Sequence, residues 1–112
     1  MSVENLDEVD VVSVDTKSGH VVLTISDHLD WSDTFNHQAV LQKKINAYLA
    51  FVESGEILER YPDAKGRPVA LNVVFRFRPD TEGLKFLGRA RTVIESAGFS
   101  LRHEIFADSY DN

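Results

Sequence analysis

The sequence predicts an α+β fold, a two-layer sandwich in which two helices pack on one face of a four-stranded mixed sheet. Four segments alternate apolar and polar side chains with the two-residue period of half-buried strands. Two longer segments repeat apolar side chains at the three- and four-residue spacing of amphipathic helices. The order of these segments is ββαβαβ, and 112 residues suit a single α/β domain. We therefore expect one domain over residues 1–112, with an ordered core over roughly 9–106.

The first two strands are predicted to form a hairpin. Valine and isoleucine dominate residues 9–15 and 20–26, and the four residues between them are typical of a turn. Gly19 can adopt the positive φ that closes such a loop. The predicted register places Val14 opposite Val21, so that every second side chain of each strand points toward the core.

A long helix is predicted over roughly residues 32–53. Asp30 or Ser32 can cap it, and Asp33 in its first turn would complement the helix dipole. Gly55 is placed to end it in a left-handed conformation. The buried stripe is expected to consist of Leu41, Ile45, Tyr48, Leu49 and Val52.

A connector over residues 56–67, anchored by Ile57, Leu58 and Tyr61, is predicted to lead into the clearest strand, residues 69–77. All odd-numbered positions of that strand are large and apolar, which predicts that they face the core.

A second helix is predicted over roughly residues 81–97, capped by Asp80 or Thr81 and stopped by Gly98. Its buried side is expected to consist of Phe86, Leu87, Ala90, Val93, Ile94 and Ala97. Residues 99–106 alternate again and form the last strand, joined to the preceding one by a right-handed crossover. The sequence leaves the order of the strands open.

Composition excludes several classes of function. The chain has no cysteine, so disulfides and thiolate metal sites are excluded, and we expect a reducing, cytoplasmic location. The acidic first residues do not resemble a signal peptide, and no apolar run approaches the ~20 residues that span a bilayer. Residues 1–40 hold eight acids and one base, which gives a net charge of −7, whereas the whole chain has a net charge of −6. That charge disfavours nucleic acid and membrane surfaces and suits a basic or polar protein partner.

Several stretches resemble a known family when they are taken together. They are residues 21–31, residues 41–49, Glu53-Ser54-Gly55-Glu56-Ile57, Tyr61-Pro62-Asp63-Ala64-Lys65-Gly66 and Ala97-Gly98-Phe99. The family consists of short bacterial proteins and is classed as a domain of unknown function, and the resemblance covers roughly residues 8–104. It implies a bacterial, single-domain α/β protein and carries no activity, cofactor or catalytic residue.

The first candidate site is the polar turn between the second strand and the first helix. His28, Asp30, Asp33 and His37 could converge on a divalent metal, because Asp33 and His37 are one helical turn apart. A small metal- or ligand-dependent enzyme built on residues 27–37 is therefore one hypothesis. We favour the alternative that the acids cap the helix and satisfy backbone amides, with His37 at the core margin. Trp31 is interpreted as a packing residue over the end of the core rather than a binding aromatic.

The second candidate site is the outer face of the sheet, which neither predicted helix covers. The expected binding residues on this face are Val11, Val22, Val74, Asn72, Arg76 and Arg102. A partly apolar uncovered face suits a symmetric dimer or a protein partner, and the alternative is a solvated face with scattered valines. Arg76, Arg78 and Arg102 could instead form an anion site, unless Glu104 pairs with Arg102.

Enzyme signatures are missing from the sequence. The glycines lack the clustered spacing of a phosphate loop, and no nucleophile elbow occurs. The sequence therefore predicts a non-enzymatic binding or accessory domain without a cofactor, acting through a protein partner or as a homodimer.

Overall fold

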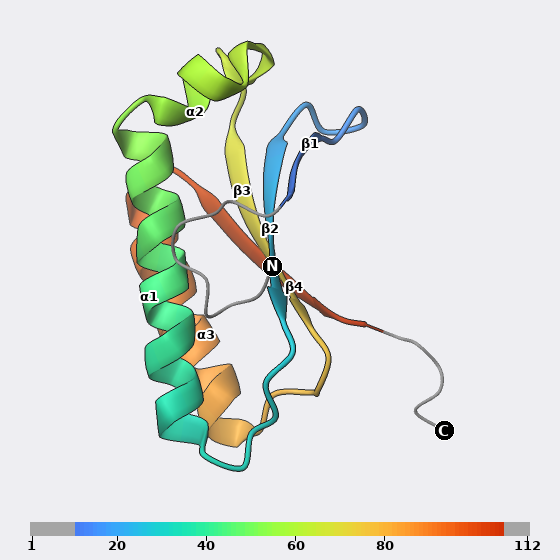
Figure 1. The fold of residues 1–112 in the computed structure, drawn as a ribbon, viewed down its shortest axis with the longest axis vertical. Coiled ribbons are helices and arrows are strands. Elements are labelled where there is room, and N and C mark those ends of the chain that lie inside the picture. Colours follow the sequence, from blue (N-terminus) through green and yellow to red (C-terminus); the bar gives the residue numbers. More distant parts are fainter. Residues whose placement is uncertain (1–10, 107–112) are drawn as a thin grey trace.

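A computed structural model describes residues 11–106 of the chain (Figure 1). Over that range the strands are β1 (Val11–Val14), β2 (Val21–Asp27), β3 (Val69–Phe75) and β4 (Ser100–Ile105). The helices are α1 (Thr34–Glu53), α2 (Glu56–Arg60) and α3 (Thr81–Ser96), with a single 3-10 turn η1 (Pro62–Ala64). None of the helices between residues 11 and 106 has the length and hydropathy needed to cross a bilayer.

The four strands form one open mixed sheet in the order β1-β2-β3-β4. β1 runs antiparallel to β2, whereas β2, β3 and β4 are parallel neighbours. The hairpin register is confirmed, because Val14 pairs with Val21 and Gly19 closes the loop at a φ of +78°. Parallel neighbours need crossover connections, which α1 and α3 supply.

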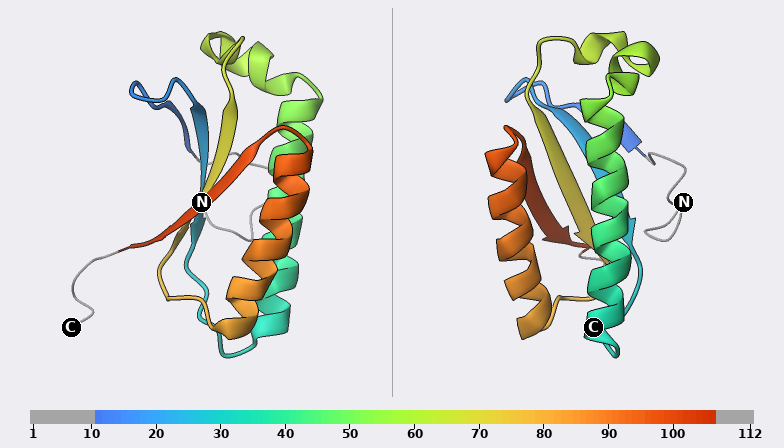
Figure 2. Two further views of the ribbon diagram at one scale, coloured as in Figure 1. Left: turned by 180° about the vertical axis from the view of Figure 1, so that it is seen from behind. Right: turned by 90° about the vertical axis from the view of Figure 1, so that its left-hand side faces the viewer.

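Both long helices lie on the same side of the sheet, and Figure 2 shows the two layers edge-on. The predicted two-layer sandwich is thus confirmed. Apolar side chains of β2, β3, α1 and α3 fill the space between the layers and are almost fully buried. The central ones are Leu23, Ile25, Leu71, Val73, Phe75, Leu41, Ile45, Tyr48, Phe86 and Ile94.

The start of α1 corrects the predicted cap. Asp33 is the N-cap, with non-helical φ and ψ of −123° and 83°, and its side chain accepts a hydrogen bond from the Asn36 amide. Asp33 was expected inside the first turn, and Asp30 or Ser32 at the cap. The helix begins later because Asp30 accepts the Ser32 amide and forms a turn of its own before the helix.

The end of β3 also differs from the prediction. The strand stops at Phe75, and Phe77 is 43% exposed instead of facing the core. The Arg76 amide donates to the Asp27 carbonyl, and the Phe77 carbonyl accepts instead from the Trp31 side chain. The chain therefore leaves the sheet before its apolar alternation ends.

The cap of α3 is confirmed, since Asp80 accepts the Gly83 amide at 2.7 Å. The predicted buried side of α3 includes two residues too many, because Val93 is 64% exposed and Ala97 is exposed as well. Ala97 is the C-cap, beyond the last turn, and Val93 lies to the solvent side of the stripe that Ala90 and Ile94 define.

The connector contains more structure than predicted. It forms α2 and η1, and Ile57 is buried there as expected. Leu58 is 44% exposed, so its predicted anchoring role is wrong. Gly55 has a φ of +86° and separates α1 from α2, which confirms that α1 ends at this glycine.

Candidate functional site

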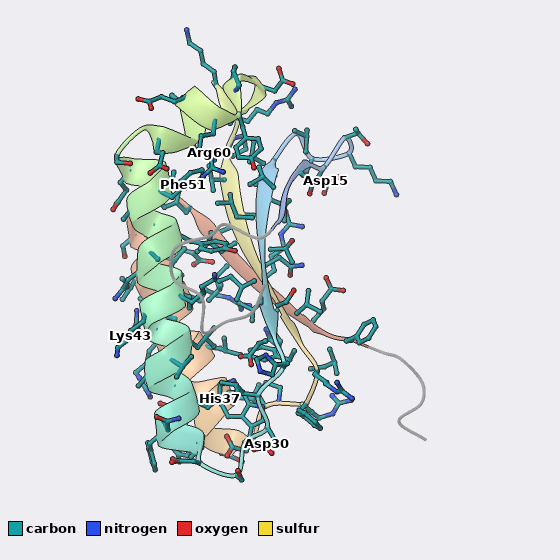
Figure 3. The ribbon with its side chains drawn as sticks, viewed as in Figure 1. Asp15, Asp30, His37, Lys43, Phe51 and Arg60 are labelled. Atoms are coloured by element: carbon teal, nitrogen blue, oxygen red, sulfur yellow. The ribbon has the colours of Figure 1, made fainter. Side chains whose placement is uncertain are left out.

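A buried aspartate–histidine pair joins the end of β2 to the start of α1. Asp27 is the last residue of β2 and points into the core, because it continues the alternation of the buried odd-numbered positions. Its Oδ2 atom lies 2.6 Å from Nε2 of His37, and the two side chains are 0% and 1% exposed. Figure 3 shows His37 between the helix and the sheet, with Asp30 in the turn below it.

Hydrogen-bond chemistry fixes where a proton must lie on His37. Its Nδ1 atom is 2.9 Å from the Asp30 carbonyl oxygen, which can only accept, so Nδ1 carries a hydrogen. The contact between Nε2 of His37 and Oδ2 of Asp27 must also contain a proton, because without one the lone pairs of these two atoms would face each other. The pair is therefore either an imidazolium with a carboxylate or a neutral imidazole with a carboxylic acid.

Aromatic rings enclose this pair. The Trp31 ring stacks on His37 with 3.7 Å between ring centroids and 19° between planes, and Phe75 contacts both rings. Trp31 also packs against Gly83 of α3, where an added Cβ would lie 2.8 Å from the indole. The indole thus covers the end of the core between α1, α3 and β3, as a packing residue does.

The four candidate metal ligands line one open hollow of about 340 Å³ but do not converge. Asp30 accepts hydrogen bonds from the side chain and the amide of Ser32, which lower its pKa below the usual value. Asp33 caps α1, and both ring nitrogens of His37 are engaged. Within residues 11–106 no three histidine, aspartate or glutamate side chains are arranged to hold a metal ion.

Sequence reasoning missed the partner of His37, because Asp27 was assigned to the turn. Two signals could have found it. Asp27 continues the inward-facing positions of β2, and His37 lies one helical turn before the buried Leu41. Two inward-pointing polar residues on neighbouring elements must satisfy each other, since a buried unpaired polar group is costly.

The outer sheet face is less open in its centre than at one end. Val22 is only 9% exposed and Ala70 is fully buried, whereas Asn72, Val74 and Arg102 are partly exposed. The backbone of Val11 pairs with Thr24, and its side chain lies outside the described part of the chain.

Arg76, Arg102 and Glu104 on this face take part in contacts other than an anion site. The Asn72 amide donates to Glu104 at 2.8 Å. The Arg76 guanidinium lies over the Phe77 ring, 5.7 Å from its centroid. The pKa of Asp15 is lowered mainly by the hydrogen bond from the Lys17 amide, then by Ser18, with a smaller contribution from the positive charge of Arg102.

A shallow hollow of about 300 Å³ opens on the outer face at the carboxyl ends of β2 and β3. Its lining combines apolar, cationic and polar side chains, namely Ser26, Asp27, His28, Val74, Arg76 and Phe106. Arg76 is exposed and Phe106 is 53% exposed. The hollow brings predicted Val74 and Arg76 together with His28, and adds Phe106 at the end of the last strand.

Comparison with known proteins adds a family to this geometry. A family model matches residues 1–107, nearly the whole chain. The chain belongs to DUF6572, a family of unknown function. Searches of curated proteins and of solved structures found no match. Membership of DUF6572 confirms the resemblance to a family of unknown function, and any activity must be argued from the site itself.

Proposed function

We propose that this DUF6572 protein is a non-enzymatic binding domain that engages a protein surface through the outer face of its sheet. The observation that carries the proposal is the asymmetry of the two layers. α1 and α3 both pack on the inner face, while Val74, Arg76 and Phe106 surround a hollow on the other. Aromatic and arginine side chains beside apolar surface are the composition that protein interfaces favour.

Charge supports a protein as the ligand. The acidic first 40 residues repel phosphate backbones and anionic lipid, whereas the outer face mixes Arg76 and Arg102 with Glu104. A mixed-charge rim around an apolar centre suits another folded protein, either a partner or a second copy. The cysteine-free composition fits a reducing compartment, so we place this binding in the cytoplasm.

The enzyme hypothesis receives less support from the geometry. The Asp27–His37 pair joins a carboxyl group to an imidazole, but both side chains are buried and both imidazole nitrogens are engaged in hydrogen bonds. A general base must reach the proton it abstracts. The contacts favour a structural role for this pair, which holds the β2–α1 turn in place.

Affinity capture with two matched variants tests the proposal. Val74→Lys adds a charge beside the hollow on the outer face, and Val93→Lys makes the same change at an exposed position of α3. The unmodified protein and both variants are immobilised, after circular dichroism has shown that they fold, and captured proteins are quantified by mass spectrometry.

We expect a protein retained by the parent and by Val93→Lys, whose recovery with Val74→Lys falls about tenfold or more, because a buried unpaired ammonium weakens an interface by over ~1.4 kcal/mol. Identical capture by both variants would contradict the proposal.

A further inference from the structure

β4 forms an edge of the sheet, and within residues 11–106 no strand pairs with its outer side. The Phe106 amide donates to the Phe75 carbonyl of β3, so even-numbered residues at this end of β4 direct their backbone amides and carbonyls toward β3. Successive residues of a strand direct these groups to opposite sides. The amides and carbonyls of Leu101, His103 and Ile105 therefore point to the free edge.

The residues of β4 are complementary to themselves when the strand is reversed about His103. Leu101 then lies opposite Ile105, and Arg102 lies opposite Glu104. The apolar pair belongs to the inner face and the charged pair to the outer face, as the alternation of the strand requires. Each of these two pairs occurs twice around the two-fold axis, so both favourable contacts are doubled in the dimer.

We propose that a second copy of this chain adds to β4 in antiparallel orientation, centred on His103, so that the two sheets become continuous. The register agrees with the backbone directions. His103 with itself, and Leu101 with Ile105, become the hydrogen-bonded pairs that exchange two main-chain bonds each. Arg102 and Glu104 fall at the non-hydrogen-bonded positions, where opposing side chains approach most closely.

The local contacts leave these groups available for such pairing. The His103 ring lies against Phe75 on the inner face, with 5.9 Å between centroids, so it does not obstruct the edge. Glu104 accepts one hydrogen bond from Asn72 on the outer face, and a carboxylate can accept several more. Asn72 lies on β3, so this bond draws the carboxylate toward the interior of the sheet, and pairing with Arg102 of the copy would use its remaining acceptor positions at the edge.

This inference goes beyond the proposed function, because it uses an edge of the sheet and leaves the outer face open. A two-fold axis normal to the sheet keeps all helices on one side and places both outer faces side by side on the other. The dimer would therefore present two copies of the hollow around Val74 and Arg76 on one continuous surface.

Charge reversal with a compensating swap tests the register. Arg102→Glu and Glu104→Arg each place like charges opposite one another, and we expect each to raise the dimer Kd about tenfold or more. The two variants move the net charge in opposite directions, so a general charge effect would strengthen one of them. Arg102→Glu combined with Glu104→Arg restores opposite charges at both positions, and we expect it to recover the parent Kd. Sedimentation equilibrium measures all four proteins.

A cross-link locates the two-fold axis independently. The chain has no cysteine, and hydrogen-bonded antiparallel pairs have Cα atoms about 5.5 Å apart, within disulfide range. Mild oxidation should convert His103→Cys to a covalent dimer, whereas Ser96→Cys on α3 should form no covalent dimer. A parent that is monomeric up to ~1 mM, or a swap that fails to restore the dimer, would overturn the inference and assign the charges of β4 to edge protection. Val74→Lys should leave the dimer intact, which separates this result from that of the proposed function.

Discussion

Asp27→Ala is the substitution whose cost follows most directly from the buried contacts. It removes the 2.6 Å contact with His37 and the hydrogen bond that Asp27 accepts from the Leu29 amide. It also leaves Nε2 of His37 without its partner in a site that is 1% exposed. Breaking a buried pair in this way costs about 3–5 kcal/mol. The whole fold of 112 residues should be stable by only about 5–15 kcal/mol, so this loss is large.

Asp27→Asn is the matched control. An asparagine can accept the Leu29 amide and donate to Nε2 of His37, while Nδ1 still donates to the Asp30 carbonyl. At most the difference between a charge-assisted and a neutral hydrogen bond is lost, about 1 kcal/mol. Urea unfolding at pH 7, followed by circular dichroism and by fluorescence of the single tryptophan, measures both variants. Equal losses for the two substitutions, or a loss under about 1 kcal/mol for Asp27→Ala, would refute the role of the pair.

Three further predictions concern the same end of the fold. Gly83→Ala should destabilise the protein by about 1–3 kcal/mol, because its Cβ would lie 2.8 Å from Trp31, whereas Gly88→Ala, with open space around it, should stabilise by about 0.5–1 kcal/mol; thermal unfolding compares the two. Asp80→Ala should cost about 1–2 kcal/mol through loss of the α3 cap, and a smaller loss in urea unfolding than about 0.5 kcal/mol would show that the cap is dispensable. Asp30 has a pKa lowered below 3.8 by hydrogen bonds from the serine two residues later, so its stabilising contribution is complete above pH 3.8 and lost as pH falls through the lower folded value. The difference between urea midpoints at pH 5 and pH 3 should therefore shrink in Asp30→Asn, and an unchanged difference would argue against this role.

Periodicity predicted the layers because apolar burial acts along a whole element. The hairpin register followed from the alternation of β1 and β2, and the start and end of α3 from Asp80 and Gly98. Where periodicity gave the wrong boundary of an element, competing local hydrogen bonds determined where that element ends. Phe77 has the right period for β3, but its carbonyl accepts from the Trp31 side chain outside the sheet.

The candidate sites were likewise predicted only in part from the sequence. The sequence identified the polar turn before α1 but not its central contact, because Asp27 and His37 meet only when α1 packs on β2. The outer face was identified from alternation, yet the low exposure of Val22 does not follow from that alternation. The hollow beside Val74 depends on where β2, β3 and β4 end in space, which strand periodicity does not determine.

Hydroxyl-radical footprinting tests most directly whether the uncovered sheet face is where this protein meets another. Phe106 lies on that face and Phe35 lies on α1, and they are 53% and 68% exposed. Oxidation of each phenylalanine is compared between the purified protein and the protein in extract of its own cells. Protection of Phe106 with unchanged labelling of Phe35 is the result we expect. Equal labelling of Phe106 in both samples, or protection confined to Phe35, would contradict binding through the outer face.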